Sequence, residues 1–134
     1  EAAYKKSLEI LDYLGLRDVA NEYAGNLPYG KQRKVEIGRA LVSDPKLILL
    51  DEPAAGMNPQ ESEELMSLIK GILKLGSAVV LIEHNMRLVM GISDRVVVLD
   101  FGKKIADCSP KEAQCNTQVI EAYLGKEESE HAGN

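Results

Sequence analysis

Apolar residues recur three or four positions apart in the first third of the chain, which is the spacing of helices that bury one face. This pattern predicts two short helices within residues 2–23, separated by a break at Gly15. A further helix is predicted over residues 30–42, where Asp44-Pro45 ends it.

Two short apolar runs follow, and both are typical of strands. Residues 47–50 are all aliphatic and lie between Pro45 and Pro53, which predicts a strand buried on both faces of a parallel sheet. Residues 78–82 predict a second strand. The chain between the two strands is long enough for a helix, so the sequence predicts a βαβ unit with a right-handed crossover.

The crossover helix has clear start and stop signals. Asn58 is placed to cap its first turn, Pro59 suits the first helical position, and Glu61 can complete a capping box. Gly76 suits the left-handed position after the last turn. The rest of the chain predicts a short helix at residues 85–90, a strand at 95–99, a hairpin turn at 100–103, and small helices at 110–114 and 117–124.

Three side chains with catalytic chemistry follow the predicted strands. Asp51 and Glu52 come directly after the first strand, and His84 follows the second. Ligands bind open α/β sheets at the carboxyl ends of the strands, so we expect these side chains to gather at one edge. Asp51 can hold magnesium through water, Glu52 can orient an attacking water, and His84 can donate to a phosphate. The alternative interpretation is a solvated acidic turn with a structural histidine.

The segment Leu27-Pro28-Tyr29-Gly30-Lys31-Gln32 places a glycine and basic charge at a helix start. Unpaired amides and the helix dipole favour an anion there, although an ordinary helix start with a solvated basic face is an equal alternative. The glycine and lysine spacing also matches a phosphate-binding P-loop, but Gln32 replaces the required Ser or Thr and no strand precedes the segment. The sequence therefore predicts a sheet edge whose side chains can hold magnesium and orient a water molecule. It contains no loop that would bind the phosphates.

Composition excludes several classes of protein. A net charge of −5 and an isoelectric point near 5.1 argue against a broad nucleic-acid surface. The aliphatic run at residues 78–82 is far shorter than the ~20 residues of a membrane span, and no secretory signal opens the chain. Cys108 and Cys115 lack the spacing of a zinc site or a redox pair. We expect a cytoplasmic chain with free thiols and a disordered acidic tail over residues 126–134.

Four motifs in this order resemble those of ATP-binding-cassette (ABC) ATPases. Residues 27–32 resemble the signature motif, residues 47–52 resemble Walker B with its adjacent catalytic glutamate, residues 54–58 resemble the D-loop, and His84 resembles the switch histidine. In detail, residues 27–30, 51–59 and 119–125 are most similar to the ATP-binding subunits of branched-chain amino acid importers.

The resemblance implies an α/β fold of the P-loop NTPase type, with a parallel sheet core, helices, and most of the helical subdomain. Residues 1–44 would belong to the helical subdomain with its signature motif, and residues 45–125 to the C-terminal part of the catalytic core. The Walker A loop, the Q-loop and their strands would precede residue 1. We therefore expect a fragment that is inactive alone and binds ATP and Mg²⁺ weakly or not at all.

Site roles also come from the resemblance. Glu52 and His84 would be catalytic and Asp51 would hold magnesium through water, all in cis. The signature residues Leu27, Pro28, Tyr29, Gly30, Lys31 and Gln32 would contact ATP held by a second ATP-binding subunit in a head-to-tail dimer. The D-loop residues would be Ala55, Gly56 and Asn58. Two residues depart from the family pattern, since Pro28 replaces a serine that contacts the γ-phosphate and Asn58 replaces an aspartate.

The expected function is therefore ATP hydrolysis that energises import, here of branched-chain amino acids, by a subunit bound to transmembrane permease subunits at the inner face of the membrane. The alternatives are an ABC ATPase of another import system, a chromosome-maintenance ATPase, disfavoured by the lack of sustained heptads, and a noncatalytic interaction fragment. Missing strands would expose an apolar edge, which predicts self-association or partial unfolding.

Overall fold

The computed structural model describes residues 1–123 of the chain. The described residues divide into two compact units, Glu1–His84 and a second that begins at Asn85, which are described separately. Residue 124, the predicted end of the last helix, and the predicted tail at 126–134 lie outside the described residues. The subdomain boundary predicted at residue 44 stays a prediction.

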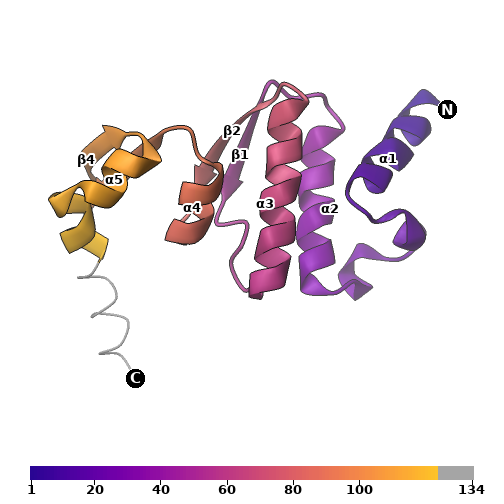
Figure 1. Ribbon diagram of the computed structural model, residues 1–134. Coiled ribbons are helices and arrows are strands. Elements are labelled where there is room, and N and C mark those ends of the chain that lie inside the picture. The colour runs from indigo at the N-terminus through magenta and orange to yellow at the C-terminus, as the bar shows by residue number, and fades with distance from the viewer. Residues whose placement is uncertain (124–134) are drawn as a thin grey trace. The chain divides into compact units, whose positions relative to one another are not determined.

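Three helices form one side of the first unit: α1 (Ala2–Tyr13), α2 (Tyr29–Leu41) and α3 (Pro59–Lys74), with α2 and α3 side by side in Figure 1. Gly15 has a φ of +67°, which ends the first helix where the sequence predicted a break. The second short helix predicted before residue 23 is replaced by a 3₁₀ turn at Arg17–Val19, and a second 3₁₀ turn follows at Ala24–Asn26. Segments this short form a single turn because few backbone hydrogen bonds offset the cost of starting a helix.

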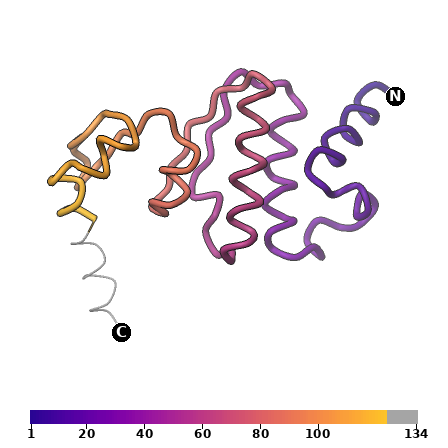
Figure 2. The backbone as a smooth tube through the Cα atoms, viewed as in Figure 1, coloured from indigo at the N-terminus to yellow at the C-terminus, as the bar shows by residue number. Residues whose placement is uncertain are grey.

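The strands β1 (Leu47–Asp51) and β2 (Ala78–Ile82) pair in parallel, from Leu47 opposite Ala78 to Asp51 opposite Ile82. The backbone trace in Figure 2 runs from β1 through a short loop into α3 and back to β2. The parallel pairing and the intervening helix of the predicted βαβ unit are confirmed, its right-handed crossover stays a prediction, and the register brings the carboxyl ends of both strands to the same level.

One prediction about β1 is wrong. Ile48 and Leu50 are buried, but Leu47 and Leu49 are 52% and 70% exposed. Successive side chains of a strand point to opposite faces, and within the first unit only the face that carries Ile48 and Leu50 is buried. The aliphatic run therefore lies in a sheet that is buried on one face.

The crossover helix α3 supplies the core and has the predicted caps. Leu65, Ile69 and Ile72 are almost completely buried along one face. The Asn58 side chain accepts from the Glu61 amide and the Glu61 side chain accepts from the Asn58 amide, both at 2.9 Å, so the capping box is confirmed. This box fixes the point where the loop after β1 becomes a helix.

The second unit contains α4 (Met86–Ile92), β3 (Val96–Asp100), β4 (Lys103–Cys108) and α5 (Pro110–Cys115), followed by helical residues 117–123. The antiparallel hairpin β3–β4 turns at Phe101 and Gly102, whose φ values of +44° and +76° match a two-residue hairpin turn. The hairpin was predicted at this position. Cys108 and Cys115 are free. No helix in the described part of the chain combines the length and apolar character needed to cross a bilayer.

Candidate functional site

The candidate site lies at the carboxyl ends of β1 and β2. The ladder continues one bond beyond the strands, because the Glu52 amide donates to the Ile82 carbonyl at 2.8 Å. Asp51 and Glu52 are both exposed at this edge. Glu52 has a φ of +44°, a sparsely populated conformation for a residue with a side chain, and this turn ends the strand. Such conformations are concentrated at functional sites, where the surrounding structure holds them.

Asp51 fits a magnesium site of the kind that nucleotide enzymes use. Magnesium keeps several waters and takes one or two carboxylates together with substrate phosphates, so a single exposed strand-end carboxylate is a suitable donor. Among residues 1–123 there is no group of three or more His, Cys, Asp or Glu side chains placed to hold a metal ion. The two acids and His84 therefore do not form a metal-ligand cluster, and magnesium binding by Asp51 through water stays a prediction.

His84 is exposed at the end of the first unit, two residues after the last residue of β2. Its backbone amide donates to Glu83 Oε2 at 3.2 Å. The structure thus places the backbone of His84 at the same sheet edge as Asp51 and Glu52.

Sequence reasoning placed Glu83 at the end of the second strand but assigned it no role. Its half-buried carboxylate accepts from the Ala54 amide at 3.1 Å through Oε1 and from the His84 amide through Oε2. The signal available in the sequence was an acid immediately before His84 at a strand end, but its partner Ala54 lies 29 residues away in the chain and only the fold reveals that contact.

The loop after Glu52 is held by local hydrogen bonds. The Ala55 amide donates to the Glu52 carbonyl and the Met57 amide donates to the Ala54 carbonyl, each at 3.1 Å. Gly56 has a φ of +75°, which a residue with a side chain adopts only with strain. The predicted D-loop residues Ala55, Gly56 and Asn58 therefore form a compact turn that ends in the α3 cap.

The predicted signature segment leads into α2. Pro28 is the cap residue and makes no side-chain capping bond, so the first amides of the helix have no side-chain acceptor at that position. Gln32 Nε2 donates to the Leu27 carbonyl at 2.8 Å and ties the loop to the helix. Lys31 forms an exposed ion pair with Asp18 at 3.6 Å, which partly offsets the charge expected to attract an anion.

Two close approaches join the predicted signature segment to the predicted D-loop and to the first turn of α3 that follows it. Gly30 is buried, and a β-carbon added there would lie 3.0 Å from Glu61 Oε1 of the α3 capping box. The Tyr29 ring lies against Gly56, where an added β-carbon would be 3.4 Å from a ring carbon. Sequence reasoning did not predict that these segments touch.

Arg33 completes the surroundings of Tyr29. Its guanidinium lies 5.1 Å from the centre of the Tyr29 ring and its Nε donates to the Tyr29 hydroxyl at 2.9 Å. A hydrogen bond to Glu36, and to a smaller extent one to Tyr29, raises the pKa of Arg33 above its usual value, so the guanidinium stays charged. A cavity of about 180 Å³ lies between α2 and the end of β1, lined on its polar side by Arg33, Glu36 and Asp51.

Comparisons with known proteins agree on one family. The family described as "ABC transporter" matches residues 2–55, and the family described as "Branched-chain amino acid ATP-binding cassette transporter" matches residues 103–129. The chain is 48% identical over 117 residues to the high-affinity branched-chain amino acid transport ATP-binding protein LivG of Salmonella typhimurium, covering 87% of the chain and 46% of the relative. The corresponding protein BraF of Pseudomonas aeruginosa is 45% identical over the same shares.

A solved structure shows the same arrangement of elements. The ADP conformation of MJ1267, an ATP-binding cassette of an ABC transporter, superposes with a TM-score of 0.86 at 32% sequence identity. The match covers 93% of this chain and 51% of that chain, so the predicted ABC ATPase fold is confirmed for the part present. The chain spans about half the length of the relatives it matches.

Proposed function

We propose that this chain, which belongs to the ABC transporter family of ATP-binding proteins, is part of a subunit that hydrolyses ATP to drive import of branched-chain amino acids. The observation that carries the proposal is the sheet edge where Asp51 and Glu52 follow β1 beside the end of β2. The match of residues 103–129 to the branched-chain amino acid transporter family supports the class of cargo.

In this proposal, Asp51 would hold magnesium through water, and a bound ion would supply charge neutralisation for the ATP phosphates. Glu52 accepts a hydrogen bond from the attacking water and orients it towards the γ-phosphate. His84 donates to a γ-phosphate oxygen or keeps the water and the carboxylate in place. These three residues act on the ATP of their own subunit.

The signature segment acts on the ATP of a second ATP-binding subunit. The unpaired amides at the start of α2, including that of Gly30, and the charge of Lys31 are suited to the γ-phosphate. Opening of the Lys31–Asp18 ion pair would free that charge on dimer closure. Closure of the dimer would move the partner permease subunits in the membrane. The ATP-binding subunit would be peripheral, on the inner face of that membrane.

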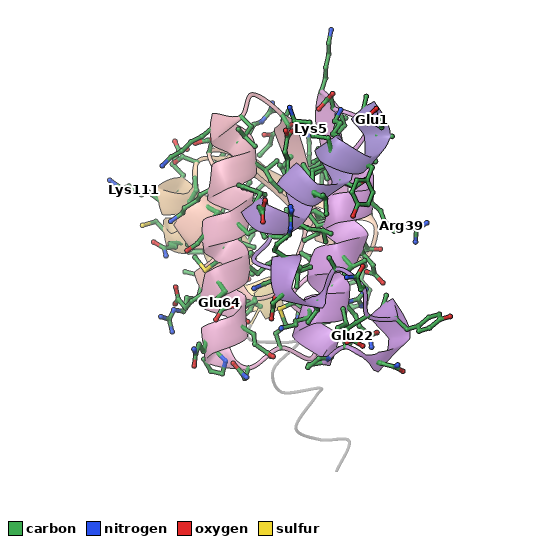
Figure 3. The ribbon with its side chains drawn as sticks, turned by 90° about the vertical axis from the view of Figure 1, so that its right-hand side faces the viewer. Glu1, Lys5, Glu22, Arg39, Glu64 and Lys111 are labelled. Carbon is green, nitrogen blue, oxygen red and sulfur yellow. The ribbon has the colours of Figure 1, made fainter. Side chains whose placement is uncertain are left out.

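The substitution Glu52→Gln tests the catalytic assignment in the complete subunit. It removes the carboxylate that orients water and retains its size, so kcat for ATP hydrolysis should fall about 100-fold or more while ATP binding is kept. Glu64→Gln is the matched control, because Glu64 pairs with Lys34 on the helical side of the unit (Figure 3) and should leave kcat unchanged. Undiminished turnover of the Glu52→Gln subunit would remove Glu52 from the mechanism.

The 134-residue chain provides a second comparison. The printed sequence has no Gly-x-x-x-x-Gly-Lys-Ser/Thr loop, so we expect no magnesium-dependent turnover from this chain alone.

The cargo is tested by deleting the gene and measuring uptake of labelled leucine, isoleucine and valine, which should fall while methionine uptake is retained. Loss of methionine uptake alone would assign the subunit to another import system.

A further inference from the structure

Glu83 directly precedes His84, and its side chain reaches the separate segment that follows Glu52. It is the first residue after β2, and its two carboxylate oxygens accept from different backbone amides, that of Ala54 at 3.1 Å and that of His84 at 3.2 Å. Hydrogen bonds from amides to an ionised carboxylate are stronger than those between neutral groups, so both segments are held firmly.

The bond to Ala54 acts on the turn that presents Glu52. Ala54 is buried and lies two residues after Glu52, whose positive φ requires support from its surroundings. The Ala55 amide already closes this turn onto the Glu52 carbonyl. The Glu83 carboxylate attaches the same turn to the end of β2.

The bond to His84 acts on the peptide group that carries the imidazole. A single carboxylate therefore sets the position of the Glu52 turn relative to the His84 backbone. The strands do not need this contact for their pairing, because the ladder extends from Leu47 opposite Ala78 to the bond between the Glu52 amide and the Ile82 carbonyl. Glu83 acts beyond the last bond of the ladder, where the proposed catalytic residues lie.

We propose that Glu83 is a positioning residue for ATP hydrolysis, which fixes the Glu52 turn and the switch-histidine backbone relative to each other through its two carboxylate oxygens. This inference rests on the proposed function. The bridge, meaning the two hydrogen bonds from the Ala54 and His84 amides to Glu83, involves only residues of this chain. A displacement near 1 Å at a reacting group can cost as much as about 100-fold in rate, so a bridge at this place has a large effect on kcat.

The test compares Glu83→Gln with Glu83→Ala. Glutamine keeps the size of the side chain but has one acceptor oxygen and one NH₂ donor, so it can accept from only one of the two amides at a time. In the complete subunit we expect kcat to fall about 10-fold for Glu83→Gln and about 100-fold for Glu83→Ala, with KM for ATP changed less than twofold. Glu64→Gln again serves as the control, since it removes a carboxylate hydrogen bond on the helical side of the unit.

Amide resonances of the 134-residue chain give a readout that does not depend on activity. The Ala54 and His84 amide protons should both move upfield in Glu83→Ala, whereas those of β1 and α3 should keep their positions. Unmoved Ala54 and His84 resonances in both variants would overturn the bridge. Moved resonances with unchanged kcat would overturn the positioning role and leave the proposed function intact, whereas a wild-type subunit without ATPase activity would overturn the proposed function and leave the bridge intact.

Discussion

At the scale of single residues, carboxylates in this chain differ because their partners differ. Glu83 accepts from two backbone amides, Glu61 completes a helix cap, and Glu64 pairs with a lysine side chain. Asp51 and Glu52 are exposed at a strand end, where a ligand can reach them. The same side-chain chemistry therefore serves bridging, capping and the proposed catalysis according to position in the fold.

Asp107 offers a measurable residue-level prediction. A bidentate contact from Arg95 at 2.7 and 2.8 Å lowers the pKa of Asp107 from its usual 3.8 to about 2. Because the folded-state pKa is lowered, the contact stabilises the second unit above pH 3.8, and this contribution is lost as the pH falls from 3.8 towards 2. Titration of the Asp107 carboxyl carbon by NMR should show a midpoint near 2 in the wild-type protein.

The variant Arg95→Gln should raise that midpoint towards 3.8, since the largest cause of the shift is removed. Lys104→Gln is the control with a smaller effect, because Lys104 Nζ lies 3.5 Å from Asp107 and contributes less. An equal midpoint in the wild-type protein and Arg95→Gln would show that the ion pair does not form in solution.

At the scale of elements, the N-termini of α2 and α3 meet through Gly30. A β-carbon at Gly30 would lie 3.0 Å from Glu61 Oε1, so Glu61 would have to shift by a few tenths of an ångström while its Oε2 accepts from the Asn58 amide. The signature segment and the D-loop helix are therefore linked within one unit. We therefore expect a substitution in either segment to alter the packing of the other.

Gly30→Ala tests this link. Alanine normally stabilises a helix relative to glycine, but here its β-carbon would disturb the capping box, so the free energy of unfolding should fall by about 1 kcal/mol. Urea unfolding of the 134-residue chain measures the change. In a Glu61→Ala background the same substitution should become neutral or stabilising, and a loss of stability there as large as in the wild type would show that Glu61 is not the obstacle.

At the scale of the whole molecule, the first unit has one covered and one uncovered sheet face. Leu49 and Val80 are 70% and 51% exposed on neighbouring strands, and Leu47 and Ile82 add to the same apolar surface. Surfaces of this kind favour association of the chain with other copies. The predicted self-association rested on an apolar edge left by missing strands, whereas the exposed apolar residues of the structure lie on one face of the sheet.

Leu49→Lys should reduce that association. Sedimentation velocity over a range of protein concentrations should show self-association of the wild-type chain and a shift towards monomer in the variant, because a charge on the exposed face resists burial. Leu75→Lys is the matched control, since Leu75 is 72% exposed just after α3, outside the strands, and its replacement should leave association unchanged. A wild-type chain that stays monomeric at every concentration would contradict the prediction.

Much of this protein was decided locally and could be predicted from the sequence. The strands at Leu47 and Ala78, the Asn58–Glu61 capping box and the hairpin turn at Phe101-Gly102 all depend on residue types and short spacings, so their bounds agree with the structure. The positions of Asp51, Glu52 and His84 at one sheet edge followed from parallel pairing.

Only the tertiary structure decided which groups touch across long separations. The Glu83 bridge to Ala54, the fit of Gly30 against Glu61 and the exposure of Leu49 depend on how distant segments pack, and no local spacing encodes such contacts. The physical reason is that secondary structure and capping are set by neighbouring residues, whereas burial and hydrogen-bond partners are set by the complete arrangement of the chain in space.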